Sequence, residues 1–259
     1  LYWLHLLEQG GDNNKVVEAA EEALKVLPKG SLREQAADYL INAAKSLGNS
    51  SLKLKGYEEK LYSFPGEKNL LNLLKIAEEL GLREKKIEEV LKFFEKNNDS
   101  PSLHIKTLLM AGKLYEAFEK IQKTNAYGWS DSGNSCGLLY GAILNYLTMG
   151  KGKIIDEFFK EYAEEIFPRF SYSTEKIDEG KLTCFNQLQK GLKMVKITEP
   201  EKENMLSWVT DIGKKRVEYI VDNKHRSAYR RAALTLTALV EAYKILNNIT
   251  LSKQLLHDY

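Results

Sequence analysis

The sequence predicts an all-α protein made of stacked helical hairpins, and three observations support this prediction. First, leucine occurs 38 times among 259 residues and valine only nine times. Leucine keeps its rotamer freedom in a helix, whereas β-branched residues lose theirs. Second, apolar residues recur at helical spacing along most of the chain, and no segment alternates with period two for long enough to predict a strand. Third, glycines that end one helix and precede the next recur every 31 to 38 residues.

The first strongly marked helix is predicted over residues 31–47. Ser31 and Glu34 have the spacing of a capping box, in which a hydroxyl and a carboxylate satisfy N–H groups at the helix start. Gly48 then supplies a left-handed stop. Between these signals the apolar residues have helical spacing: Ala36, Leu40, Ala43, Ala44 and Leu47.

Later helices are marked in the same way. Pro101 after Ser100 indicates a helix start, because proline is tolerated in the first turn. Thr198 and Glu201 are spaced to cap a long helix. The clearest apolar stripes are those of Ile87, Val90, Leu91 and Phe94, then Met205, Trp208, Val209, Ile212 and Ile220, and finally Tyr229, Ala232, Ala233, Leu236, Leu239, Val240 and Tyr243.

Four dipeptides each close one predicted helix and open another: Leu47-Gly48, Leu80-Gly81, Ala111-Gly112 and Met149-Gly150. The steps between their glycines are 33, 31 and 38 residues. This is the pitch of a helical hairpin repeat, in which each pair of helices buries its apolar face only by stacking on the next pair.

At these positions the sequence resembles tetratricopeptide-like α-solenoids with degenerate repeats. In residues 76–81 and 109–118 a helix ends at glycine and the next begins almost at once, and residues 23–28 look like the closing turn of a repeat. The resemblance covers roughly residues 10–125 and 225–259. It implies a right-handed superhelix of antiparallel hairpins with a concave groove that binds protein partners.

A second resemblance is carried by two short segments. Residues 127–137, with Trp129 and Ser130, and residues 224–233 are similar to helical regions of uncharacterised prokaryotic proteins with SWIM zinc fingers. The cysteine and histidine pattern of the zinc finger itself is absent from this sequence. The resemblance therefore implies only the helical domain that accompanies such a finger.

A loop rich in Gly, Ser and Asn at residues 125–136 is predicted to join two regions. Residues 1–124 would form an N-terminal hairpin stack of about eight helices, and residues 137–259 a C-terminal region of about five or six. A single continuous superhelix is the alternative. A further irregular stretch covers residues 168–183.

Composition excludes several classes of protein. Lys and Arg number 38 against 36 Asp and Glu, so the net charge of +2 excludes a bulk polycation. Cys136 and Cys184 lie too far apart in sequence for a zinc motif, so we expect neither a metal nor a disulfide framework, and a reducing cytoplasm is the default location. The longest apolar stretch, residues 232–240, is too short to span a bilayer. We see no signal peptide, and expect the chain to be cut from a longer protein or to be processed.

One segment carries more positive charge than the sequence as a whole. Residues 214–231 carry a local charge of +5, from two acids and seven cations: Lys214, Lys215, Arg216, Lys224, Arg226, Arg230 and Arg231. Such a cluster can hold a peptide carboxylate, a phosphate or an RNA backbone, and Tyr219, His225 and Tyr229 among the cations can stack on bases. The alternative is a structural role, in which the arginines pair with acids on a neighbouring helix.

The sharpest catalytic motif is Gly133-Asn-Ser135-Cys-Gly137, which matches the nucleophile elbow of serine hydrolases. The elbow needs a strand before the serine, and the residues before Ser135 predict a loop. We therefore interpret Ser135 as part of a turn before a helix. Trp129 in the same loop is either a surface anchor for a partner or a side chain that packs into an adjacent helix.

Together these observations predict a non-catalytic protein-interaction or scaffolding module without a cofactor. The expected partner is an acidic protein or peptide, bound at Trp129 and at the cluster of residues 214–231. Nucleic-acid binding by that cluster is the first alternative, and a serine hydrolase at Ser135 is the second. The sequence predicts neither the partner's identity nor the oligomeric state.

Overall fold

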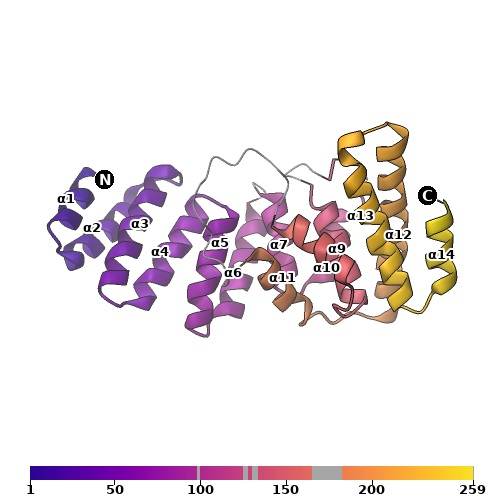
Figure 1. Ribbon diagram of the computed structural model, residues 1–259. Coiled ribbons are helices and arrows are strands. Elements are labelled where there is room, and N and C mark those ends of the chain that lie inside the picture. The colour runs from indigo at the N-terminus through magenta and orange to yellow at the C-terminus, as the bar shows by residue number, and fades with distance from the viewer. Residues whose placement is uncertain (98–99, 125–127, 130–133, 165–182, 259) are drawn as a thin grey trace. The chain divides into compact units, whose positions relative to one another are not determined.

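The computed structural model describes residues 1–97, 100–124, 128–129, 134–164 and 183–258 (Figure 1). These residues form fourteen α-helices and one short 3₁₀ helix, and none of them forms a strand, so the all-α prediction is confirmed. The helices are α1 (Tyr2–Gln9), α2 (Asn13–Val26), α3 (Ser31–Ser46), α4 (Ser50–Ser63), α5 (Glu67–Glu79), α6 (Arg83–Lys96), α7 (Pro101–Met110), α8 (Leu114–Ile121), α9 (Cys136–Leu147), α10 (Lys153–Ala163), α11 (Cys184–Leu192), α12 (Glu199–Asp222), η1 (Arg226–Ala228), α13 (Tyr229–Ile245) and α14 (Ile249–Asp258).

The chain divides into two compact units, Leu1–Leu103 and His104–Tyr259, so the division falls inside α7. The sequence instead predicts a boundary at residues 125–136, most of which lie outside the described residues. The helix between these two positions, α8, packs against α9 and so belongs with the second unit.

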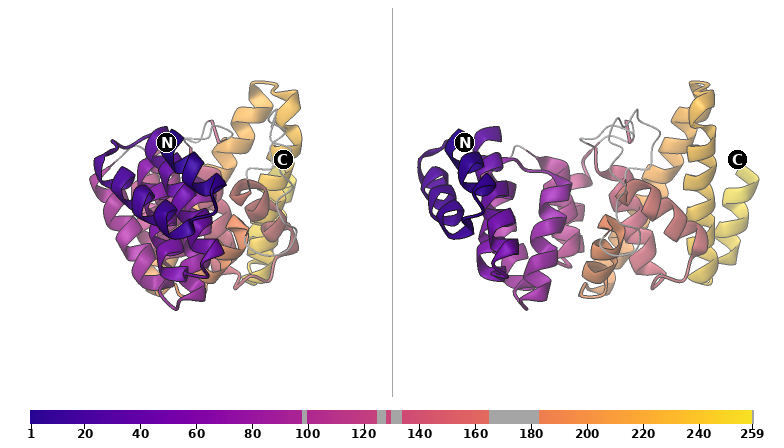
Figure 2. Two further views of the ribbon diagram at one scale, coloured as in Figure 1. Left: turned by 90° about the vertical axis from the view of Figure 1, so that its left-hand side faces the viewer. Right: turned by 60° about the vertical axis from the view of Figure 1, so that its left-hand side comes forward.

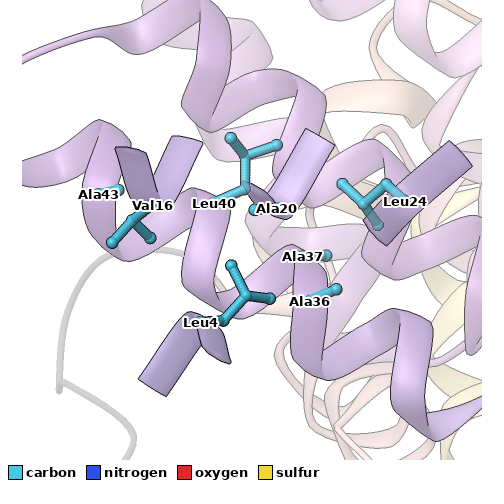
Figure 3. Close-up of a cluster of buried hydrophobic side chains, with 8 residues drawn as sticks. All are labelled: Leu4, Val16, Ala20, Leu24, Ala36, Ala37, Leu40 and Ala43. Atoms are coloured by element: carbon cyan, nitrogen blue, oxygen red, sulfur yellow. The ribbon is translucent and has the colours of Figure 1, made fainter. Parts of the chain in front are cut away.

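The first unit is built by packing between sequence neighbours. Each helix from α1 to α5 packs against the one that follows it, and α1 also contacts α3. Figure 3 shows the resulting core between α1, α2 and α3. It combines small and branched apolar side chains, namely Leu4, Val16, Ala20, Leu24, Ala36, Ala37, Leu40 and Ala43. The alanines let the helices approach closely while the leucines fill the space between them.

Ion pairs tie α3 and α4 together beside this core. Arg33 donates to Glu59 Oε2 from Nε at 3.0 Å and from Nη2 at 2.7 Å, and its Nη1 donates to the Leu27 carbonyl at 2.7 Å. Lys60 Nζ on α4 lies 2.6 Å from Asp38 Oδ1 on α3. These partly buried pairs position the face of α3 that carries Asp38.

The second unit is organised around α9. Residues 136–145 of this helix are all buried, and α9 contacts α8, α10, α11, α12 and α13. The hairpin α9–α10 packs against the hairpin α12–α13, whose long helices run side by side in Figure 2. Because its faces are covered, α9 can be mostly apolar rather than amphipathic.

Helices end at the glycines where the sequence predicts that they end. Gly48, Gly81 and Gly112 have φ values of 65°, 68° and 76°, in the left-handed region that glycine adopts without a Cβ penalty. After Gly48, the Asn49 N–H donates to the Ala44 carbonyl at 2.9 Å and closes the helix end. Gly150 also has a positive φ, 67°, after the equally left-handed Met149.

Of the two predicted capping boxes, one is confirmed and one is wrong. At the start of α12 the Glu201 carboxylate accepts from the Thr198 N–H at 2.6 Å and from its hydroxyl at 2.8 Å. α3 begins at Ser31 itself, with Gly30 at the cap position and no side-chain cap. The Gly30 backbone, with φ of 135°, brings the chain into the helix one residue earlier than the serine motif predicts.

Across the described residues, every helix is too short or too polar to cross a membrane.

Candidate functional site

The structure does not gather the seven cations of residues 214–231 into one surface. Arg216 is 5% exposed and points into the second unit, whereas Lys214 is half-buried. Lys215 is exposed and pairs with Asp211 on its own helix at 2.7 Å. The three are consecutive on α12, so helical geometry turns each one about 100° from the last.

Arg230 has the structural role that the sequence offers as an alternative. Its Nη1 donates to Glu161 at 2.8 Å, and its Nη2 lies 3.4 Å from Glu157. Both acids are on α10, which packs against α13. Arg231 is half-buried and also interacts within the protein. The Arg230 ion pairs therefore join α13 to α10.

Lys224 and Arg226 remain exposed in the turn between α12 and α13. Neither side chain has a hydrogen bond or an ion pair among the described residues. Between them, the His225 ring lies 5.3 Å from the Tyr219 ring, measured between centroids. We call residues 224–226 the basic turn. It is the part of the predicted cluster whose cations are exposed and have no ion pair among the described residues.

Trp129 lies in the interior and is not a surface anchor, since its side chain is 1% exposed. Its ring centroid is 5.4 Å from that of Tyr140 and 6.2 Å from that of Tyr162. The Arg216 guanidinium carbon lies 5.7 Å from the Trp129 ring centroid, a cation–π arrangement. Of the two interpretations of Trp129, packing into an adjacent helix is therefore confirmed.

Ser135 and Gly137 lie next to the same aromatic cluster. Ser135 precedes α9 and is 3% exposed, and the strand that a nucleophile elbow requires is absent from the described residues. A Cβ on Gly137 would lie 2.1 Å from the Tyr162 ring. This close approach gives the second glycine of the motif a packing role. His225, which follows later in the sequence, is exposed in the basic turn.

Burial favours the neutral forms of Tyr162, Tyr140 and the neighbouring Cys136, and so raises their pKa values. It raises the pKa of Tyr162 to about 12, although Arg216 and Arg231 act in the opposite direction. It also raises the pKa of the Cys136 thiol to about 12 and the pKa of Tyr140 well above its ordinary value. A thiol that stays protonated is a poor nucleophile. Cys136 and Cys184 are both buried and free.

A surface site that the sequence does not predict lies in the first unit, between α1 and α3. It is an open pocket of about 270 Å³ lined by five side chains, namely Glu8, Gln35, Asp38, Tyr39 and Asn42. The four α3 residues have spacings of three, one and three residues, so they project from one helix face. We call this the α1–α3 pocket. In the sequence, the pocket is indicated only by the polar face of α3, which lies next to the buried apolar face of the same helix.

Within the described parts of the chain, no three or more His, Cys, Asp or Glu side chains are grouped to hold a metal ion.

Comparison with known proteins finds no family model, curated protein or solved structure that matches this chain.

Proposed function

We propose that this chain is a non-catalytic protein-interaction module, built as a right-handed superhelix of tetratricopeptide-like hairpins. The observation that carries the proposal is the α1–α3 pocket. It is formed by the first helices of two successive hairpins, α1–α2 and α3–α4, and it is polar while the opposite side of α3 is apolar core. A stack that presents such helices side by side offers a partner an extended surface with repeated polar contacts.

The test is affinity capture from a nuclease-treated lysate of the source organism, with the purified chain as bait. The informative variant is Gln35→Ala with Asn42→Ala, which removes two pocket amides without changing any charge. The matched control is Lys92→Ala with Glu95→Ala, at two exposed positions of α6. A protein retained by wild type and control but lost from the pocket variant supports the proposal. Equal retention by all three proteins contradicts it.

The free, buried state of both cysteines supports the further proposal that the protein works in the reducing cytoplasm.

Nucleic-acid binding is the second candidate, and the basic turn is the observation that favours it. Lys224 and Arg226 are exposed beside the Tyr219–His225 ring pair, an arrangement suited to phosphate contact and base stacking. Replacing both cations by alanine should lower affinity for single-stranded RNA and reduce the slope of log K against log salt by about 1.4. Replacement of Lys215, which pairs with Asp211, should change the slope less. An unchanged slope in the double variant contradicts this candidate.

A further inference from the structure

The α1–α3 pocket carries an acidic group, Glu8, that has no counter-ion among the residues the structure describes. Glu8 on α1 is half-buried, and its Oε1 accepts a long 3.4 Å hydrogen bond from Asn42 Nδ2. No cation pairs with Glu8 among the described residues. The second carboxylate, Asp38, receives Lys60 Nζ at 2.6 Å on one oxygen, Oδ1. With Glu8, Asp38 and Lys60 counted together, the pocket has a net charge of −1.

The other lining groups suit a planar cation. The side-chain amides of Gln35 and Asn42 each offer a carbonyl oxygen that accepts hydrogen bonds. Tyr39 packs partly against the core of the first unit and also lines the pocket, so its ring is held in place. An aromatic ring fixed beside a carboxylate is a favourable surface for stacking a guanidinium group.

The size of the pocket suits a single side chain. A pocket of about 270 Å³ lies just below the range of roughly 300–1,000 Å³ found for drug-sized ligands. It is also broadly open to solvent, which allows the rest of a peptide to continue across the surface. These dimensions fit one long side chain of a bound protein.

From this arrangement we propose that the α1–α3 pocket binds an arginine side chain of the partner protein. Arginine is preferred to lysine because its planar guanidinium can engage the Glu8 carboxylate with two hydrogen bonds while stacking on Tyr39. The inference rests on the proposed interaction function and deepens it. It also reverses the charge expected from the sequence, since the partner is basic at this contact.

The test uses a defined probe, N-acetyl-arginine-methylamide, titrated into the ¹⁵N-labelled full chain and followed by NMR. We expect saturable shifts of the Gln35 and Asn42 side-chain amide signals. The matched citrulline compound, which has the same shape without the charge, should shift these signals at least tenfold more weakly at equal concentration. Equal shifts with the two compounds would overturn the inference.

Glu8→Gln keeps the size of the side chain and removes its charge, so it should abolish the preference for arginine over citrulline. The control is Glu22→Gln, which makes the same change in net charge at an exposed position of α2 and should retain the preference. Thermal unfolding of both variants establishes that they are folded. A preference that persists in Glu8→Gln would overturn the inference. If a protein is captured through the pocket amides but the arginine preference is absent, only this inference fails and the proposed function stands.

Discussion

Gly191 of α11 lies directly against the backbone of Leu109 in α7. A Cβ at position 191 would be 2.0 Å from the Leu109 carbonyl oxygen and 2.8 Å from the Met110 backbone. The clash would be with main-chain atoms, which cannot rotate away as a side chain can. The second unit therefore depends on a glycine at this point of contact.

We expect Gly191→Ala to lower the free energy of unfolding by about 3 kcal/mol, at the upper end of overpacking effects, because two helices must separate to admit the methyl group. Thermal or urea unfolding measures this loss. The control is Gly10→Ala, at a right-handed position with φ of −72° where a Cβ meets its nearest neighbour, the Leu7 carbonyl oxygen, at an ordinary 3.4 Å. That variant should stay within about 0.5 kcal/mol of wild type. Equal stability of the two variants would contradict this account.

Gly48→Ala tests the left-handed helix ends without any steric clash. No atom lies within 4 Å of a Cβ built at Gly48, but its φ of 65° is unfavourable for alanine. We expect a loss of about 1 kcal/mol in the free energy of unfolding. Urea unfolding beside Gly10→Ala isolates the backbone contribution. A loss no greater than that of the control would show that the end of α3 relaxes to another conformation.

Glu241 of α13 caps the start of α10, through contacts made across 87 and 86 residues of sequence. Its Oε2 accepts from the N–H groups of Ile154 at 2.8 Å and Ile155 at 2.9 Å. Glu241→Ala removes a carboxylate from a helix N-terminus and leaves two donors without their acceptor, so we expect a loss of about 2 kcal/mol.

Glu241→Gln should fall between wild type and alanine, because one amide oxygen can still accept these bonds. Glu203→Ala removes a carboxylate from an exposed position of α12 and serves as the control. It should leave the free energy of unfolding nearly unchanged. Urea unfolding of the three variants ranks them by their free energy of unfolding. A glutamine variant as unstable as the alanine variant would mean that the charge alone stabilises α10.

Tyr162 gives the second unit a specific alkaline sensitivity. Its pKa is raised from 10.0 to about 12 by burial, so the folded state favours the protonated phenol. The resulting stabilisation is fully present below pH 10 and is lost as the pH rises through 12, by up to about 3 kcal/mol for two pKa units. Tyr162→Phe should therefore lose less stability than wild type between pH 9 and roughly 12.

The measurement is urea unfolding at a series of alkaline pH values. Tyr2→Phe, at a side chain that is 77% exposed, is the control and should follow the wild-type curve. Parallel curves for wild type and Tyr162→Phe would contradict the role assigned to burial of this phenol.

Features that depend on short stretches of chain were predictable from the sequence. The helical class, the stops at Gly48, Gly81 and Gly112, and the capping box of Thr198 and Glu201 all follow from spacings of a few residues, because helix hydrogen bonds and caps join near neighbours. Even here Ser31 shows the limit, since the Gly30 backbone starts α3 without the predicted serine cap.

The tertiary structure alone decided what the polar and aromatic side chains do. Arg216 belongs by sequence to a cationic cluster, yet packing of α12 on α9 places it over buried Trp129. Arg230 is neutralised by acids of α10, and Glu8 meets Asn42 only because α1 lies against α3. Helical periodicity determines which face of a helix is buried, but the neighbour on that face is set by long-range packing. The physical reason is that a side chain pairs with whatever charged or hydrogen-bonding group folding brings next to it. That group can be tens of residues away in the sequence.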